Sequence, residues 1–343
     1  MSEERTEIAD LGEFGLIEHL TRNIEIQNAS SLLGVGDDAA VIDHFGKQTV
    51  VTTDLLIEGV HFDLMYTPLR HLGYKSVVVN LSDVYAMNAI PTQIVIGIGF
   101  SNRFSLEALD DFYEGVYAAC TKYGVDLVGG DTTSSQRGFI ISVTAIGEVA
   151  PDEYVKRSTA QKGDLLCVSG DLGGAYVGLL FLEREKKIYL ESPGVQPDLE
   201  GESYVVGKLL KPEARKDIIE FFAEAGVKPT AMMDVSDGLS SEILHICKDS
   251  ALGCVVYEDK LPIAEDMKMA AYKFEIDPTA CALSGGEDYE LLFTIPQAEY
   301  DKLVLNEQIS VIGYMTEPEQ GSNIITKGGS RYPLTAQGWN HLK

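Results

Sequence analysis

Two hydrophobic periods alternate along this chain, one of about 3.6 residues that predicts helices and one of two residues that predicts strands. The clearest helical pattern covers residues 105–123, where Ser105 can cap the start and Gly124 suits the end. Residues 68–87 form a second helical pattern. Pro68 suits its start, because proline is favoured in the first turn of a helix. Further helices are predicted at residues 13–21, 212–225 and 240–248.

Short segments rich in β-branched residues predict strands. Residues 48–53 form a strand that delivers Asp54 at its tip, and residues 125–128 form a short buried strand that runs into Gly129-Gly130-Asp131. Other strands are predicted at residues 93–100, 139–149, 164–169, 253–257 and 291–295. Residues 182–201 have no sustained period, so we expect a variable excursion there.

Helices and strands alternate in both halves of the chain, which predicts the α+β class with two α/β domains. Residues 150–163 mix charge, proline and glycine, which is typical of a junction. We therefore place one domain at residues 1–149 and a second at residues 150–343. A chain of 343 residues is long enough for each domain to bury its own core.

The charge balance is strongly acidic, with 53 Asp and Glu residues against 27 Lys and Arg residues and a net charge of −26. Binding to nucleic acid or to an anionic membrane surface depends on clustered cationic side chains, so the composition argues against both. An acidic protein can still bind a nucleotide where metal ions neutralise the pocket.

The residue pattern also predicts a cytoplasmic location. The first seven residues have neither a basic segment nor an apolar segment, and no apolar run approaches the length of a membrane span. The five cysteines are dispersed without a CxxC pair, so we expect buried thiols in a reducing compartment and no zinc site.

Six short segments place acidic residues beside Gly, Ser or Thr: Gly36-Asp37-Asp38, Thr52-Thr53-Asp54, Asn80-Leu81-Ser82-Asp83, Gly129-Gly130-Asp131-Thr132-Thr133, Asp234-Val235-Ser236-Asp237-Gly238 and Ser284-Gly285-Gly286-Glu287-Asp288-Tyr289-Glu290. Each one alone is more typical of a surface turn. Together they favour one pocket, because glycine allows close approach to a ligand and carboxylates are hard oxygen donors. Such a pocket needs cations to relieve its repulsion, which predicts several Mg²⁺ ions holding a phosphate substrate.

Common nucleotide and nucleophile motifs are missing from the sequence. There is no GxxxxGK[ST] loop, no GxGxxG between a strand and a helix, and no nucleophile elbow. The nearest glycine-rich loop is Gly170-Asp171-Leu172-Gly173-Gly174, for which a turn into a helix and a phosphate contact both stay open.

The ordered set of acidic segments resembles the ATP-binding superfamily of aminoimidazole ribonucleotide synthetase, and within it the thiamine-monophosphate kinases. Gly12-Glu13-Phe14 near the start and Gly338-Trp339-Asn340-His341 near the end fit the same pattern, so the resemblance covers nearly the whole chain. It implies transfer of the γ-phosphoryl group of ATP to thiamine monophosphate, with Mg²⁺ as cofactor and ATP as co-substrate. It also implies a homodimer whose N-terminal sheets form a barrel-like core. No acid or base residue is needed, because the acceptor phosphate is already ionised.

The resemblance implies a role for each motif residue. The metal ligands would be Asp38, Thr52, Thr53, Asp54, Asp83, Asp131, Asp234 and Asp237. The ATP contacts would be Gly130, Asp131, Arg157 and Ser236. The thiamine substrate contacts would be His61, Glu287 and Trp339.

Four of these residues have ordinary alternatives. Arg157 could be a solvated linker charge, His61 a packed histidine, Glu287 a turn cap and Trp339 a C-terminal hydrophobic plug. Asp37, beside Asp38, is expected to fix the turn through its side chain.

The rival functions are another enzyme of the superfamily and a binding module without turnover. A selenophosphate synthetase would need a reactive cysteine near the N-terminus, whereas the first cysteine is Cys120, inside a predicted helix. An aminoimidazole ribonucleotide synthetase would not be expected to carry both residues 284–291 and the Gly338-Trp339 ending. A module without turnover would be free to lose some of the carboxylates.

Overall fold

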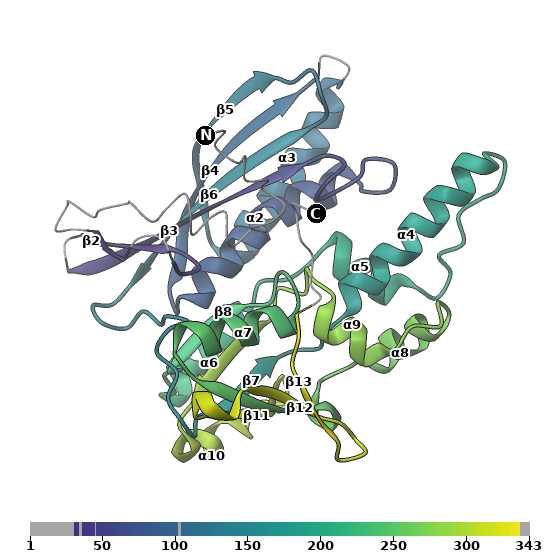
Figure 1. The fold of residues 1–343 in the computed structure, drawn as a ribbon. Helices are drawn as coiled ribbons and strands as arrows, with labels where there is room; N and C mark the ends of the chain where they lie inside the picture. The colour runs from purple at the N-terminus through teal and green to yellow at the C-terminus, as the bar shows by residue number, and fades with distance from the viewer. Residues whose placement is uncertain (1–30, 34–35, 45, 102–103, 337–343) are drawn as a thin grey trace, which may run out of the picture.

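The computed structural model describes residues 31–33, 36–44, 46–101 and 104–336, and in them the chain forms two mixed sheets (Figure 1). The N-terminal sheet has the strand order β1-β2-β3-β6-β4-β5. Its elements are β1 (Ser31–Leu33), β2 (Ala40–His44), β3 (Lys47–Ile57), α2 (Leu69–Ala86), β4 (Ile90–Phe100), α3 (Leu106–Tyr123), β5 (Asp126–Ser134) and β6 (Ile140–Val149).

Helices α2 and α3 pack together and cover one face of the N-terminal sheet (Figure 1). The predicted caps of α3 are confirmed: the Ser105 side chain accepts a hydrogen bond from the Ala108 N–H, and Gly124 has a φ of 72°. The helix predicted at residues 68–87 is also confirmed as α2, with Pro68 just before it. The helix predicted at residues 13–21 lies outside the described residues.

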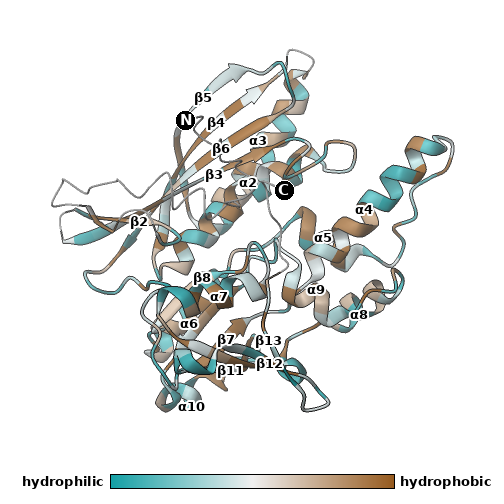
Figure 2. Cartoon of the chain, in the orientation of Figure 1, coloured by the Kyte–Doolittle hydropathy of each residue, from teal (hydrophilic) through white to brown (hydrophobic). Residues whose placement is uncertain are grey.

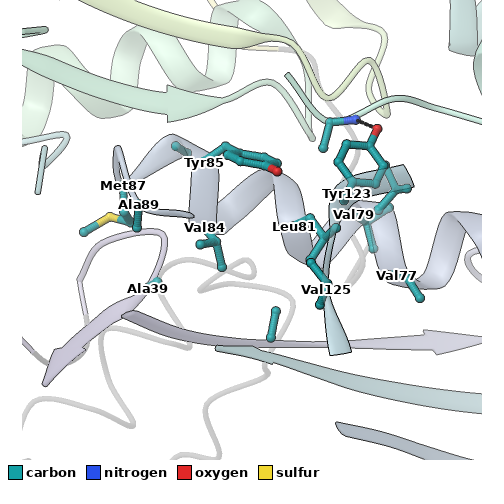
Figure 3. Close-up of a cluster of buried hydrophobic side chains, with 14 of the residues drawn as sticks. Ala39, Val77, Val79, Leu81, Val84, Tyr85, Met87, Ala89, Tyr123 and Val125 are labelled. Atoms are coloured by element: carbon teal, nitrogen blue, oxygen red, sulfur yellow. Dashed lines mark hydrogen bonds between the residues drawn. The ribbon is translucent and has the colours of Figure 1, made fainter. Parts of the chain in front are cut away.

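Helix α2 is buried on nearly every side, because it also contacts β8 of the second sheet. Apolar residues along it, including Val77, Leu81 and Val84, pack with Tyr123 and Val125 from the end of α3 and the loop that follows (Figure 3). Its hydrophobic pattern is therefore not that of a surface helix, and its polar residues must find partners inside the protein.

The C-terminal sheet has the strand order β13-β12-β9-β11-β7-β10-β8. Its strands are β7 (Leu165–Ser169), β8 (Ala231–Asp234), β9 (Gly253–Tyr257), β10 (Leu291–Ile295), β11 (Ile309–Thr316), β12 (Ser322–Ile325) and β13 (Arg331–Pro333). Its helices are α4 (Gly174–Glu191), α5 (Ser203–Leu210), α6 (Lys216–Ala225), α7 (Leu239–Asp249), α8 (Glu265–Tyr272), α9 (Pro278–Ser284) and α10 (Tyr300–Leu303), with short 3-10 turns at Glu258–Lys260, Gln297–Glu299 and Pro318–Gln320.

One cluster of buried apolar side chains runs from the N-terminal sheet into one face of the C-terminal sheet. It includes Val143 and Tyr85 from the first sheet region and Phe222 and Phe293 from the second. The other face of the C-terminal sheet has a separate cluster. The two sheets therefore share a core, which holds the segments between them in place.

Three predicted elements differ from the structure. Strand β3 continues to Ile57, so Asp54 lies inside the strand and not at its tip, because pairing with β6 extends that far. Strand β5 is a long exposed edge strand instead of a short buried one, and Gly129-Gly130-Asp131 lies within it. Helix α4 runs to Glu191, so the first half of the predicted excursion at 182–201 is helical.

The N-terminal sheet is open in the single chain, since β1 and β5 are its edges among the described residues and no closed barrel forms. Figure 2 shows apolar residues along β4 and β6. No helix within the described part of the chain has the length and apolar character needed to cross a bilayer. The five cysteines are buried free thiols, as the sequence predicts.

Candidate active site

Three carboxylates from distant parts of the chain converge between the two sheets. Asp38 precedes β2, Asp83 lies in the last turn of α2, and Asp234 ends β8. One carboxylate oxygen from each side chain lies within 4.8 Å of the others. The segments that carry them therefore meet in one place instead of forming separate surface turns. A set of carboxylate oxygens at this spacing suits a hard divalent cation such as Mg²⁺.

Strand β3 brings two more oxygen donors to this cluster. Alternate residues of a strand share a face, so Thr52 and Asp54 lie on the same side of β3 as buried Val50. The Thr52 hydroxyl donates a hydrogen bond to Oδ2 of Asp83 at 2.7 Å. The backbone N–H of Asp54 donates to Oδ1 of Asn80 on α2 at 2.9 Å. The strand and the helix are thus joined at the site by polar bonds as well as by apolar packing.

Arg157, from the segment that links the two sheets, closes one side of the cluster. Its guanidinium forms an ion pair with Asp38, and its Nε lies 3.4 Å from Oδ1 of Asp37. The backbone N–H of Arg157 also donates to Oδ2 of Asp37 at 3.2 Å. Oδ1 of Asp37 accepts the N–H of Asp38 at 3.0 Å, which confirms that Asp37 fixes this turn.

Burial raises the pKa of all four clustered carboxyl groups, Asp38, Asp54, Asp83 and Asp234. For Asp54 the pKa rises to about 6, and the charge of Asp234 adds to the effect of burial. Asp54, Asp234 and Asp38 together raise the pKa of Asp83 further. Arg157, the hydroxyls of Thr52 and Ser82 and a backbone hydrogen bond to Asp234 oppose this rise in pKa. The four carboxylates thus outnumber the one cationic side chain that pairs with the cluster among the described residues.

A second observation also supports a divalent cation at this carboxylate cluster. Oδ2 of Asp38 is buried and has no hydrogen-bond partner among the described residues. A buried carboxylate oxygen without a partner is costly in free energy unless it binds a ligand or water. Asp38, Asp54, Asp83 and Asp234 are therefore the residues best placed to hold Mg²⁺, with Thr52 beside them.

Ser236 and Asp237 follow β8 and lie beside the segment that carries Glu287. The backbone N–H of Glu287 donates to the Ser236 carbonyl at 2.7 Å. A Cβ atom at Gly286 would lie only 2.4 Å from the same carbonyl oxygen, so only glycine permits this approach. The structure thus brings the fifth and sixth acidic segments together next to Asp234.

His61 lies in the turn after β3. Nδ1 of the His61 ring accepts a hydrogen bond from the backbone N–H of Ile57 at 3.0 Å. The backbone N–H of His61 donates to the Ile57 carbonyl at 2.9 Å. The ring is therefore oriented by the end of β3. Trp339 lies outside the described residues, and its predicted role stays a prediction.

Gly130, Asp131 and Thr53 do not join the carboxylate cluster in the single chain. Asp131 on β5 pairs with Gly97 on β4, which lies in register with Leu55 on β3 across the intervening strand β6. Asp131 therefore lies on the same face of the sheet as exposed Leu55. Strands β6 and β4 separate β3 from β5, a distance of about 14 Å at the usual strand spacing.

Thr53 also points to that exposed face, next to Thr144, whose hydroxyl donates to the Thr53 hydroxyl at 3.1 Å. Gly130 allows β5 to approach β4, because a Cβ there would lie 2.0 Å from the Ile96 carbonyl oxygen. The predicted metal and ATP roles of these three residues stay predictions.

Three residues around the site escaped prediction from the sequence. Glu242 on α7 accepts the backbone N–H of Asp237 at 2.9 Å, and its position in the first turn of a helix was an available signal. Buried Lys75 on α2 forms an ion pair with partly exposed Glu287, 212 residues away. Burial raises the pKa of Tyr289, and the nearby charges of Glu287 and Asp54 raise it further.

Comparison with known proteins agrees with this geometry. Residues 36–149 match the family described as AIR synthase related protein, N-terminal domain. A solved structure described as "Crystal Structure of Hydrogenase Maturation Protein HypE in complex with ATP" has a TM-score of 0.69 and covers 98% of this chain and 100% of the other. At 20% identity it shows a shared fold alone. The two sheets and their mixed α/β elements are therefore those of the AIR synthase-like class.

Closer relatives identify the family within this class. Thiamine-monophosphate kinase of Aquifex aeolicus is 33% identical, covering 98% of this chain and 99% of the relative, and that of Bacillus subtilis is 32% identical, covering 97% and 100%. The solved structure described as "AaThiL complexed with AMPPCP and TMP" has a TM-score of 0.83 at 31% identity, covering 99% of this chain and 100% of the other. The chain belongs to the thiamine-monophosphate kinase family.

Proposed function

We propose that this protein transfers the γ-phosphoryl group of ATP to the phosphate of thiamine monophosphate, giving thiamine diphosphate and ADP. The observation that carries the proposal is the convergence of Asp38, Asp83 and Asp234 in a full-length member of this family. The solved relative with AMPPCP and TMP supports an ATP-like nucleotide and the thiamine substrate as the pair of ligands.

The carboxylate cluster would hold the metal ions. Asp38, Asp83 and Asp234 are its core, and Asp54 is close enough to Asp83 and Asp234 for their charges to interact. Asp237 follows Asp234 within the same loop. When bound, Mg²⁺ neutralises phosphate charge that develops during transfer and helps to align the reacting groups. The hydroxyl of Thr52 holds Asp83 in place and can add an oxygen donor.

The remaining residues would position the substrates and compensate charge. Arg157 pairs with Asp38 in this structure, and its guanidinium would be available to the ATP phosphates if metal ions neutralised the carboxylates. Ser236 would contact ATP from the loop after β8. The acceptor is an ionised phosphate, so the transfer needs no general base from the protein. His61, Glu287 and Trp339 would contact the thiamine substrate.

We further propose a cytoplasmic homodimer that packs through the open face of the N-terminal sheet. Leu55 and Ile90 point to that face and are 51% and 46% exposed, which is unusual for large apolar side chains. Thr53 and Asp131 lie on the same face. A second copy there would cover the apolar residues and could form the barrel-like core. The division into domains at residues 149 and 150 is part of this proposal.

The test is a phosphoryl-transfer assay with ATP, Mg²⁺ and a panel of substrates: thiamine monophosphate, thiamine and the open-chain formylglycinamidine ribonucleotide that an aminoimidazole ribonucleotide synthetase would cyclise. The proposal expects thiamine diphosphate and ADP in equal amounts, and no comparable product from the other two. Well-folded protein that leaves thiamine monophosphate unchanged would contradict it. ATP turnover with formylglycinamidine ribonucleotide would instead favour another enzyme of the same fold.

A further inference from the structure

A buried lysine on α2 forms an ion pair with a glutamate of the C-terminal part of the site. Nζ of Lys75 lies 2.9 Å from Oε2 of Glu287, and the side chains are 4% and 30% exposed. We propose that Lys75 is a positioning residue, which orients Glu287 toward the thiamine substrate. This inference rests on the proposed function, and it adds a residue that does not touch the substrate.

The environment of Lys75 fixes its ammonium group. Nζ also donates to the backbone carbonyl of Leu209 at the end of α5, at 3.2 Å. The stem of Lys75 is held by α2, which is buried between the sheets. A long flexible side chain with both its stem and its head fixed can hold a partner carboxylate in one orientation.

The backbone around Glu287 shows why such support is needed. Glu287 and Tyr289 have φ values of 64° and 52°, in the left-handed region that residues with a Cβ seldom adopt. Hydrogen bonds from their N–H groups to Ser236 and Val235 keep the segment in this conformation. Backbone strain that is held by surrounding contacts is typical of functional sites. In this conformation Oε2 of Glu287 accepts the hydrogen bond from Lys75.

The two partners of the ion pair differ in exposure, and Glu287 is the one that a ligand could reach. Lys75 approaches Glu287 from the protein interior, whereas Glu287 keeps part of its surface open. Lys75 donates to Oε2, so Oε1 would be the oxygen left for a ligand. A carboxylate oxygen held in this way can accept a hydrogen bond from the amino group of an aminopyrimidine ring.

The alternative is that the pair only joins α2 to the second sheet. In that case, loss of Lys75 would lower stability and would change the kinetic constants for both substrates alike. If Lys75 positions Glu287, its loss affects the thiamine substrate and leaves ATP nearly unaffected. The hydrogen bonds of the Lys75 ammonium group go to Leu209 and Glu287 and not to the carboxylate cluster. A comparison of the two Michaelis constants therefore separates the two roles.

The experiment compares Lys75→Met, Glu287→Gln and the double variant with wild type. Lys162→Met is the control, since Lys162 is exposed and pairs with exposed Glu317. We expect each single variant to raise KM for thiamine monophosphate about tenfold or more, with KM for ATP within about twofold. The double variant should resemble Glu287→Gln, because Lys75 acts only through Glu287. Calorimetric binding of thiamine monophosphate gives a readout that does not depend on turnover.

The double variant also covers a folding failure of Lys75→Met. It replaces the whole ion pair by neutral groups of similar size, which proteins tolerate better than an unpaired buried charge. If Lys75→Met worsens thiamine monophosphate binding further in the Glu287→Gln background, or if KM rises equally for both substrates, the positioning role is wrong. Wild-type protein that neither binds nor phosphorylates thiamine monophosphate would contradict the proposed function itself.

Discussion

The hydroxyl of Ser82 donates a hydrogen bond of 2.6 Å to Oδ2 of Asp234, although the two residues are 152 positions apart. The bond joins α2, beneath the N-terminal sheet, to the end of β8 in the C-terminal sheet. Both residues are buried. The position of Asp234 in the carboxylate cluster is thus set by a residue next to Asp83, so the cluster is assembled by the packing of α2 against β8.

Substitution of Asp54 by Asn should reduce turnover and stabilise the metal-free protein. Burial and the charge of Asp234 raise the pKa of Asp54 to about 6, so its ionised form destabilises the fold at pH 8. Removing that charge should raise the free energy of unfolding by about 1–3 kcal/mol. Turnover should fall by about two orders of magnitude or more, because a metal ligand is lost.

Thermal unfolding with EDTA at pH 8 and steady-state kinetics with Mg²⁺ check both parts. Asp43→Asn is the matched control, since Asp43 is exposed on β2. A marked loss of stability in Asp54→Asn would mean that Asp54 has a structural role instead.

Stability should fall between pH 6 and 8 partly because of Asp288. Burial raises the pKa of this carboxyl to about 8. Its folded pKa lies above the unfolded value near 3.9, so its stabilising protonation is complete at low pH and is lost as pH rises toward 8. The loss from one such group is at most about 1.4 kcal/mol per pH unit.

Asp288→Asn should flatten this dependence, because an amide does not titrate in this pH range. Its oxygen can still accept the Gly173 N–H, which Oδ2 of Asp288 accepts at 2.8 Å. Urea unfolding of both proteins at pH 6, 7 and 8 measures the slope. Asp301→Asn, at an exposed position of α10, should retain the wild-type slope. Equal slopes in Asp288→Asn and wild type would show that Asp288 does not titrate in this range.

Glu242 should support Asp237 through its backbone. Glu242→Ala removes the acceptor of the partly buried Asp237 N–H, at a cost of about 1–3 kcal/mol. Glu242→Gln keeps an acceptor oxygen and should lie within about 1 kcal/mol of wild type. The apparent KM for Mg²⁺ should rise in the Ala variant alone, since Asp237 is then less well positioned. A similar rise in both variants would assign a direct role to the Glu242 carboxylate.

Leu55→Glu should dissociate the proposed homodimer, because it places a charge on the open face of the N-terminal sheet. Sedimentation velocity measures the change from dimer to monomer. Leu305→Glu is a control at an apolar residue that is 78% exposed after α10, far along the chain from this sheet. A Leu55→Glu protein that stays dimeric would exclude this face as the interface, and wild-type monomers would exclude the dimer.

The acidic segments could be predicted as one site because each carries its chemistry in a few adjacent residues. Asp38, Asp83 and Asp234 are examples, and the structure brings them together. The position of Asp131 could not be predicted in this way. Whether it faces the cluster depends on the register of β5 against β4, which includes a bulge between Ile94 and Val95. A shift of one residue would move Asp131 to the other face.

Predictions of secondary structure failed where tertiary contacts decide the outcome. The apolar residues at 125–128 are typical of a buried strand, yet Val128 is 58% exposed because β5 lies at the edge of its sheet. Likewise, no local pattern indicates that Lys75 pairs with Glu287, since the contact forms only after α2 packs against the second sheet.

The continuous helix between Lys75 and Asp83 sets a length scale for the ligands. Eight residues of α helix span about 12 Å along the axis, and burial between the sheets leaves α2 no room to slide. The support for the proposed pyrimidine contact and the carboxylates that would hold the phosphates are therefore a constant distance apart. If both proposed contacts are made, an acceptor much shorter or longer than thiamine monophosphate could not reach both ends together, and the helix would select substrates by size as well as by chemistry.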